Sequence, residues 1–338
     1  MKIRSKDIAK QLGLSEATVS MAINNRSGVS METRKRVLRY VEELKAESGE
    51  NPEAKERVLR MFAFIEDRPF WDASEETRVY TSYMEAGRAA RELGYRLDFV
   101  HIYKNKDDFR KILMESEQEG IMGIFLNAAY MKEEDYECFQ GIKIPFIVAD
   151  QDFEDSSKDS ILLNNRQGVR QGLNYLWENG HRDILYFRNS HDFFNMYQRR
   201  DAYGEYMAAK NCGRSAEIID IGGSTQEVYD RMLAYIREGK RLPTAVFSEN
   251  YEVTIGLSNA LVSSGIRIPE DVSIVGFDEL PGTAILSFKP VCIRALHARK
   301  ARIAVERLVD RVEGRTEEAV QILINTELVP GNSVNRIY

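Results

Sequence analysis

The 338-residue sequence has few of the residues that build disulfide frameworks, metal centres or membrane spans. Its three cysteines, Cys138, Cys212 and Cys292, lie far apart without a CxxC pair, which is typical of a reducing compartment. Its four histidines show no metal-ligand spacing, so we expect neither a metal nor a cofactor. No apolar signal core follows the N-terminus, and the most apolar run, 121–131, is too short and too polar to cross a bilayer. These absences predict a soluble, cytoplasmic protein that does not associate with a membrane.

The motifs of common nucleotide-dependent and nucleophilic enzymes are also missing. The sequence has no GxxxxGK[ST] loop, no GxGxxG between a strand and a helix, and no GxSxG elbow. Asp278 and His297 are present, but no motif ties a serine or cysteine nucleophile to them. We therefore expect a protein that is not an enzyme.

Charge is distributed unevenly along the chain. Residues 1–60 carry 13 Lys and Arg against 9 Asp and Glu, whereas the whole chain has a net charge of -6. A basic head on an acidic body fits a small DNA-binding module joined to a domain with another role. The length allows two or three domains with ample material for a core.

The stretch at residues 5–25, SKDIAKQLGLSEATVSMAINN, has the pattern of a helix-turn-helix. Apolar residues recur at helical spacing as far as Leu12, and Gly13 tolerates the positive φ of a tight turn. Ser15 can cap a second helix, and Ser30 can cap a third that supplies an apolar stripe. A small helical hairpin without DNA-binding function would share the spacing. The basic head favours DNA recognition by the second helix in a major groove.

After a polar linker at 46–57, strand and helix patterns alternate twice. The first set spans 59–149 and the second spans 160–277, followed by a late helix at 298–312 that could return to the first lobe and a final strand at 322–329. The predicted fold class is therefore α/β, with two doubly wound, mainly parallel sheets in two lobes. Such sheets bind ligands beyond the carboxyl ends of their strands, so we expect a cleft between the lobes.

Several residue runs point to one family. They are KDIAKQLGLSEATVS at 6–20, VSMETRKRVL at 29–38, ELGY at 92–95, IPFIVAD at 144–150, NNRQG at 164–168, NGHRDILYF at 179–187, TAVFSEN at 244–250 and GIRIPEDVSIVGFDE at 265–279. The chain thereby resembles the LacI/GalR (lactose-repressor type) family of bacterial transcription regulators along essentially its whole length. The family's fold is a helix-turn-helix headpiece on a two-lobed core like that of periplasmic binding proteins.

The resemblance implies three parts of the chain. These are a DNA-binding headpiece at 1–46, an atypical linker at 47–58, and an effector-binding and dimerisation core at 59–338, with lobe 1 near 59–150 and 291–323 and lobe 2 near 151–290 and 324–338. The linker lacks the family's YxPNxxARSL pattern, and Leu59 is its only candidate for a minor-groove wedge. Leu59 fits better at the start of the first strand, so we do not expect a hinge helix to insert into DNA.

The implied function is a ligand-responsive repressor of carbohydrate-utilisation genes. Such a regulator binds a near-palindromic operator in double-stranded DNA as a homodimer, and a small molecule, expected to be a sugar, switches it from the interlobe cleft. The alternative is a two-lobed sugar-binding or sugar-converting protein without a transcriptional role. An exported solute-binding protein is disfavoured by the basic headpiece, and an effector-free nucleoid protein would not need a polar cleft.

Similarity to the family assigns the DNA-binding residues. Glu16 and Ala17 start the recognition helix and face bases, and Met21 holds a later base-reading position where many members have Arg. Methionine offers only apolar contact, so the operator should differ from the family's commonest half-site, and packing against the third helix is the alternative role for Met21. The full set is Ser5, Lys6, Ser15, Glu16, Ala17, Thr18, Ser20, Met21 and Asn24, in which the hydroxyl, amide and lysine side chains are expected to bind phosphates.

Similarity also assigns the effector-binding residues. Arg199 can make forked hydrogen bonds to sugar hydroxyls or a carboxylate, and Asp278 can accept from hydroxyls. The set is Phe70, Trp71, Asp150, Arg199, Asn250 and Asp278, with the two aromatic side chains as a platform for a sugar ring. Packing between the lobes is an equally good explanation for the aromatics, and a structural cap is an alternative for Asp278.

Overall fold

The computed structural model describes residues 5–23, 29–47, 56–65, 73–103, 108–139, 141–153, 158–210, 217–282 and 284–338. The chain divides into two compact units, Met1–Glu56 and Arg57–Tyr338. They are called the headpiece and the core below. None of the helices in the described ranges is both long and apolar enough to cross a bilayer.

The headpiece contains three helices, α1 (Ser5–Leu12), α2 (Glu16–Ile23) and α3 (Met31–Glu47). Gly13 has a φ of 66°, so the turn between α1 and α2 uses the backbone freedom expected of glycine. The Ser15 hydroxyl accepts a hydrogen bond from the Thr18 amide at 3.0 Å, and Ser30 caps α3 in the same way. The three helices bury one small apolar cluster, formed by Ile8, Ala9, Val19, Ala22 and Val37.

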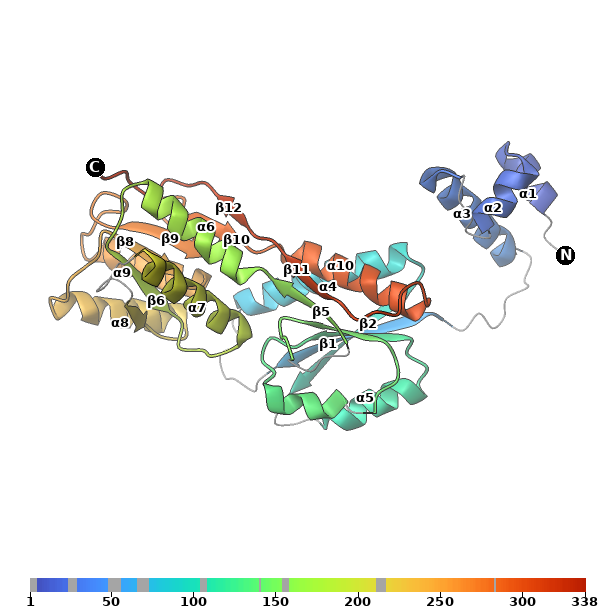
Figure 1. Cartoon of the computed structure of the whole chain (residues 1–338), viewed down its shortest axis with the longest axis horizontal. Coiled ribbons are helices and arrows are strands. Elements are labelled where there is room, and N and C mark those ends of the chain that lie inside the picture. The colour runs from blue at the N-terminus through green and yellow to red at the C-terminus, as the bar shows by residue number, and fades with distance from the viewer. Residues whose placement is uncertain are drawn as a thin grey trace. The chain divides into compact units, whose positions relative to one another are not determined.

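The first lobe of the core is built on a six-stranded sheet with strand order β11-β5-β4-β3-β1-β2. Every strand pair in it is parallel. Helices α4 and α10 bury one face of the sheet, whereas α5 and the 3₁₀ helix η1 bury the other (Figure 1). The elements are β1 (Val58–Ile65), α4 (Ala73–Glu92), β2 (Arg96–Tyr103), α5 (Phe109–Gln118), β3 (Gly123–Asn127), η1 (Glu133–Phe139), β4 (Phe146–Ala149), β5 (Asp159–Leu163), α10 (His297–Val312) and β11 (Gln321–Ile324).

The second lobe repeats this architecture with strand order β12-β10-β9-β8-β6-β7. Only β12 runs antiparallel to its neighbour among the described strands. Helices α6 and α7 cover one face, and α8 and α9 cover the other. The elements are α6 (Asn165–Glu178), β6 (Ile184–Arg188), α7 (Phe194–Ala209), β7 (Ile218–Asp220), α8 (Thr225–Arg237), β8 (Ala245–Ser248), α9 (Tyr251–Ser263), β9 (Ser273–Phe277), β10 (Val291–Arg294) and β12 (Glu327–Val329).

The chain crosses between the lobes three times. The crossings lie between β5 and α6, between β10 and α10, and between β11 and β12. Hydrogen bonds join the first crossing to the third. The Asn164 side chain donates to the side-chain oxygen of Asn325 at 2.9 Å, and the backbone amide of Thr326 donates to the side-chain oxygen of Gln167 at 2.9 Å. The three adjacent crossings form a natural hinge between the lobes.

These crossings correct the predicted lobe boundaries. Residues 151–163 were assigned to the second lobe, but β5 pairs with β4 and β11 in the first sheet. Residues 291–294 were assigned to the first lobe, but β10 pairs with β9 in the second sheet. The single final strand expected at 322–329 is two strands, one in each sheet. Local periodicity identifies a buried strand but carries no information about its pairing partner.

Candidate functional site

A cleft opens between the two lobes at the carboxyl ends of their strands. It encloses about 710 Å³, including its opening to solvent. The first lobe contributes the ends of β1, β3 and β4, and the second contributes Phe193 and the start of α7. The start of α10, next to one of the crossings, completes the wall with His297, Lys300 and Ala301. Residues from both lobes can therefore contact one small ligand at the same time.

Two aspartates occupy corresponding places in the two lobes. Asp150 follows β4 and Asp278 follows β9, and these strands have the same position in their sheets. Both residues have positive φ, 64° and 68°, and both are 5% exposed. Aspartate is one of the few residues other than glycine that tolerates this backbone conformation. The repeat of the fold thus brings two buried carboxylates to the ligand-binding end of the sheets.

Asp150 lies on the cleft wall and is held by groups from both lobes. Its carboxylate forms an ion pair with the buried ammonium of Lys300, and it accepts a hydrogen bond from the Asn195 amide nitrogen at 3.3 Å. Burial alone would raise the pKa of Asp150, but Lys300 and His297 hold it below its ordinary value. Asp150 is therefore ionised at neutral pH, although it is out of contact with bulk water.

A line of hydrogen bonds continues from Asn195 to the guanidinium of Arg199. Asn165 donates to the Asn195 side chain at 2.7 Å and accepts from Arg199 Nε at 2.9 Å. Arg199 Nη1 donates to the carbonyl of Glu249 at 2.8 Å and to Asp278 Oδ2 at 3.3 Å. The guanidinium carbon also lies 3.6 Å from the centre of the Phe277 ring. Arg199 is 1% exposed, so its orientation at the cleft is set before any ligand arrives.

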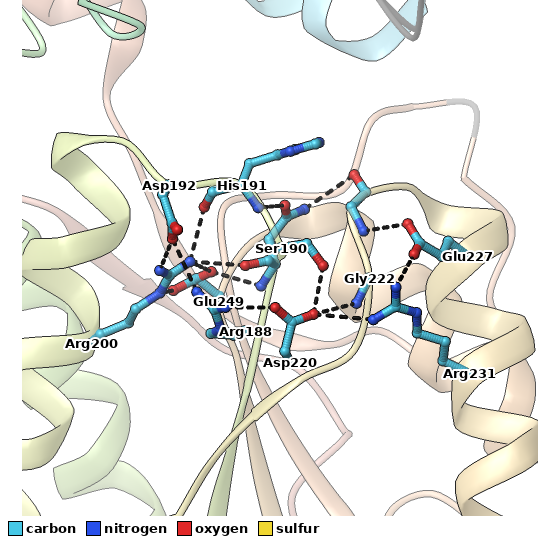
Figure 2. Close-up of polar contacts among 12 residues, drawn as sticks. Arg188, Ser190, His191, Asp192, Arg200, Asp220, Gly222, Glu227, Arg231 and Glu249 are labelled. Carbon is cyan, nitrogen blue, oxygen red and sulfur yellow. Dashed lines mark hydrogen bonds and ion pairs between the residues drawn. The ribbon is translucent and has the colours of Figure 1, made fainter. Parts of the chain in front are cut away.

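A second arginine fixes the loop that follows β6 (Figure 2). Glu249 is fully buried and accepts from Arg200 Nε at 2.6 Å and from the Asn189 amide at 2.7 Å. Arg200 Nη2 in turn donates to the carbonyls of Asn189 and His191 at 2.8 and 2.9 Å. This loop leads to Phe193, whose ring lies 5.3 Å from that of Tyr130 in the first lobe. The Arg200–Glu249 pair therefore supports one wall of the cleft without lining it.

The outer part of the same network joins the loops after β6 and β7. Figure 2 shows Asp220 at its centre, where it accepts from Arg188 at 2.6 Å and from the Ser190 hydroxyl at 2.5 Å. Arg231 reaches Asp220 at 3.3 Å and also pairs with Glu227 on its own helix. These side chains are about one-quarter to one-half exposed, so solvent screens each ion pair and its contribution to stability is small. The main role of the network is to hold the two loops in position.

The headpiece presents a polar face around the start of α2. Glu16, Ala17 and Ser20 are exposed, as expected of residues that contact DNA. Met21 is half-buried and lies outside the buried cluster of the headpiece. Lys6 on α1 is exposed, and the hydroxyls of Ser15 and Thr18 lie 2.7 Å apart. Asn24 lies outside the described residues, and only the backbone is described for Ser5.

Comparisons with known proteins agree with this architecture. The family model described as "Bacterial regulatory proteins, lacI family" matches residues 5–45, and the model described as "Periplasmic binding protein-like domain" matches residues 173–334. Together they cover more than half of the chain. The chain thus carries a helix-turn-helix domain of the lacI family followed by a periplasmic-binding-protein-like domain.

Similar proteins span the whole chain. A probable HTH-type transcriptional repressor, ExuR of Bacillus subtilis (strain 168), is 23% identical over 334 residues, which is 98% of each chain. The lac repressor dimer bound to operator and the anti-inducer ONPF has a TM-score of 0.69 at 18% identity, covering 99% of this chain and 100% of the other. A complex of the transcriptional regulator CelR with cellobiose has a TM-score of 0.67 at 20% identity, covering 98% and 100%.

A lacI-family headpiece joined to an effector-binding domain is the architecture of a transcriptional repressor, not of an enzyme. The two-lobed α/β fold expected from its sequence is confirmed. Among the described residues, no group of three His, Cys, Asp or Glu side chains is arranged to hold a metal ion.

The structure brings together part of the expected effector set. Asp150 and Arg199 line the cleft. Asp278 instead accepts a hydrogen bond from Arg199 and lines a neighbouring cavity. Asn250 is the N-cap of α9 and accepts from the Val253 amide at 3.1 Å, and it is not among the residues that line the cleft in the described part of the chain. Phe70 and Trp71 lie outside the described residues.

The sequence-based set lacks several polar residues of the site. Asn195, His297 and Lys300 line the cleft, and the buried Asn165 is hydrogen-bonded to Asn195 and Arg199. Asn165 stands inside the family-like run NNRQG, which was a usable signal. Lys300 had none, because a lysine in an amphipathic helix normally lies on its solvated face, and only the tertiary structure shows that this one is 3% exposed.

Proposed function

We propose that the chain represses carbohydrate-utilisation genes by binding a near-palindromic operator as a homodimer, and that a sugar in the interlobe cleft controls this binding. The observation that carries the proposal is the pairing of a helix-turn-helix headpiece with a cleft in which Asp150 and Arg199 face one space from opposite lobes. A pocket for a polar ligand needs a few fixed hydrogen-bonding groups among apolar walls. The aromatic and aliphatic residues around these two groups supply such walls.

Control of DNA binding would follow from the position of the cleft beside the hinge. A ligand that contacts both lobes binds the closed arrangement better than an open one, and it shifts the population accordingly. The free energy by which the ligand changes DNA affinity cannot exceed the difference in its binding free energy between the two arrangements. The cellobiose bound to CelR and the operator bound to the lac repressor dimer support this proposal by analogy of fold.

Recognition of DNA would be carried by the exposed start of α2. Glu16 and Ala17 are proposed to read bases together with Met21, while Lys6 and Ser20 contact phosphates. Leu59, the one wedge candidate in the sequence, is fully buried in β1 and cannot serve as a minor-groove wedge, while linker residues 48–55 lie outside the described part of the chain. We expect an operator that is only weakly bent.

The test combines selection of an operator with a ligand screen. The full-length protein is first used to select duplexes from a random library, and its melting temperature is then measured with a panel of carbohydrates and nucleobases. A ligand at 100 times its Kd should stabilise the folded protein by about 2.7 kcal/mol. The proposal requires a carbohydrate that stabilises the protein and changes its affinity for the selected operator. Failure to select any duplex, or turnover of the stabilising compound, would contradict it.

A further inference from the structure

Two contacts cross the cleft at the start of α7. The ring of Phe193, the residue before this helix, lies 5.3 Å from the ring of Tyr130 in the first lobe. Two residues later, the Asn195 amide nitrogen donates to Asp150 Oδ1 in the first lobe at 3.3 Å. All four residues line the cleft. The position of the loop that precedes α7 therefore helps to decide how closely the two lobes approach each other.

This loop, residues 189–193, is held by one side chain from the second turn of α7. Arg200 Nη2 donates to the carbonyls of Asn189 and His191 at 2.8 and 2.9 Å, and Nη1 forms an ion pair with Asp192 (Figure 2). The guanidinium thus binds three of the four residues that precede Phe193. Arg200 is 9% exposed, so water competes little for these bonds.

Glu249 fixes the direction of that guanidinium. Its carboxylate accepts from Arg200 Nε at 2.6 Å and from Nη2 at 3.0 Å, and it also accepts from the Asn189 amide at 2.7 Å. A planar guanidinium that is bonded at two points has one orientation, which a single ammonium group does not reproduce. The backbone carbonyl of Glu249 meanwhile accepts from Arg199 Nη1 at 2.8 Å. Two consecutive arginines therefore hold Glu249, one through its carboxylate and one through its carbonyl.

Stability alone does not explain a charged pair at this place. Removing two charges from water costs free energy that offsets their attraction, so apolar side chains of similar volume stabilise a fold equally well. Neither Arg200 nor Glu249 is among the described residues that line the cleft, so direct contact with a ligand does not explain the pair either. What the pair supplies, and apolar packing would not, is a set of directional bonds to the loop before Phe193.

We propose that Arg200, oriented by Glu249, is a positioning residue that sets how far the two lobes close. It acts by fixing the loop that carries Phe193 against Tyr130, and it does not touch the ligand. Loss of these bonds would shift the population towards more open arrangements of the lobes. The closure is a property of the core alone, whereas its effect on operator affinity rests on the proposed function.

The experiment measures the separation of the lobes in the full-length protein. Spin labels are attached to Glu134→Cys on η1 and Ala208→Cys on α7, two exposed positions in opposite lobes, after the native cysteines have been replaced by alanine. Labelled protein is diluted with an excess of unlabelled protein, so that a dimer contains at most one labelled chain. Double electron–electron resonance then gives the distance distribution within one core, without DNA or ligand.

The main variant combines Arg200→Gln with Glu249→Gln, which removes both buried charges together and leaves neither unpaired. The mean distance between the labels should rise by more than about 2 Å, the scale of a hinge rearrangement. Arg200→Lys retains a charge beside Glu249 but lacks the planar fork, so it should give a smaller increase, and it provides the test if the double variant does not fold. Arg231→Gln removes ion pairs of the outer network without touching residues 189–193, and this matched control should leave the distance unchanged.

Tyr130→Ala distinguishes positioning from a purely structural role. It should widen the distance by itself, and adding the two glutamine substitutions should widen it little further, because residues that act through one contact are not additive. Thermal unfolding is measured in parallel, since a purely structural pair would lower the melting temperature and leave the distance unchanged. An unchanged distance in folded Arg200 variants, an equal widening in Arg231→Gln, or full additivity with Tyr130→Ala would overturn the inference.

Operator affinity of the same variants tests the regulatory consequence separately. It is measured on a duplex selected by the wild type, and coupling of lobe closure to DNA binding should change it by roughly 5- to 150-fold. A wider cleft with unchanged operator affinity would support the inference while contradicting the proposed regulation.

Discussion

At the scale of single residues, the cleft depends on charged groups that are buried and held in place. Arg199 is bonded to Asn165, to the Glu249 carbonyl and to Asp278, and none of these bonds needs a ligand. Such preorganisation lowers the entropic cost of binding a small polar molecule. Its disadvantage is that removal of one charge leaves its partner buried and unpaired.

Arg199→Ala should abolish the response to effector while operator binding remains. We expect a loss of stability of about 3–5 kcal/mol, because Asp278 would be left as a buried carboxylate without its cation. Chemical denaturation and operator binding with and without effector measure the two effects. Arg166→Ala, which removes an exposed pair with Glu205, is the control and should leave the effector response intact. A normal response in Arg199→Ala would exclude this arginine from the site.

The lowered pKa of Asp150 predicts a stability that depends on acid pH. Because its folded-state pKa lies below the ordinary value of 3.8, its contribution is complete above about pH 3.8 and is lost as the pH falls through the folded-state pKa. Urea unfolding of the wild type and of Asp150→Asn across pH 2.5 to 7 tests this. The variant should lose less stability than the wild type at the acid end. Parallel curves for the two proteins would show that Asp150 is not stabilised by Lys300 and His297.

Met21 should determine part of the operator sequence. Met21→Arg should shift the selected half-site towards guanine at one position, because arginine donates two hydrogen bonds to guanine, worth about 1–3 kcal/mol of discrimination. Selection from a random duplex library provides the measurement. Met21→Leu keeps an apolar side chain and should retain the wild-type operator. An unchanged operator in Met21→Arg would mean that Met21 packs within the headpiece and reads no base.

At the scale of elements, helix α6 directly follows the first crossing and is hydrogen-bonded to the third through Gln167 and Thr326. Gly168 stands in its first half, where an added Cβ would come within 2.8 Å of Ile293 and Thr326 and 2.9 Å of Phe277. The helix can therefore approach the ends of β9 and β10 and the crossing to β12 only because position 168 has no side chain. The hinge is thus packed through backbone contact at this point.

Gly168→Ala should destabilise the core even though alanine favours helix. Relief of the close contacts costs about 1–3 kcal/mol, which outweighs the gain of up to about 1 kcal/mol in helix propensity. Gly204→Ala on α7 is a matched control, because nothing lies within 4 Å of its Cβ position, and it should be neutral or stabilising. Thermal unfolding of both variants gives the comparison. A stabilised Gly168→Ala would show that the hinge packing yields easily.

At the scale of the whole molecule, α4 exposes two large apolar side chains among the residues that the structure describes. Tyr80 and Met84 are 59% and 51% exposed, next to a groove that also contains Thr81 and Gly87. Exposed large apolar side chains beside a groove with the charged rim of Glu85, Arg88 and Arg91 are candidates for an interface with a second copy of the chain. The proposed homodimer therefore has a candidate surface in the described part of the core.

Met84→Glu should convert the proposed dimer into monomers. A carboxylate buried at an apolar interface costs several kcal/mol, so the dimer Kd should rise by more than about a hundredfold. Analytical ultracentrifugation and operator binding should show the change together, because two headpieces are needed for a palindromic site. Met114→Glu, at a 50% exposed methionine on α5, is the control. A dimer that survives Met84→Glu would place the interface elsewhere.

Much of this architecture could be predicted from the sequence because its signals are local. Gly13, Ser15 and Ser30 determine the helix boundaries of the headpiece, and all three behave as expected. The alternation of apolar strands with amphipathic helices predicted the two-lobed α/β fold. The same pattern predicted that Asp150 and Asp278 follow the carboxyl ends of two strands. In a parallel sheet these ends lie along one edge, where ligands bind.

What only the tertiary structure decided depends on partners that are distant in the chain. The sheet to which β5 or β10 belongs is decided by strand pairing. A short run of consecutive buried residues looks the same in the sequence whichever strand lies beside it. Lys300 lies 150 positions from the carboxylate that it meets, and Asn250, expected in the cleft, caps a helix with its amide oxygen. Burial and pairing are properties of the packed molecule, so the charge of the cleft appears only when the lobes are assembled.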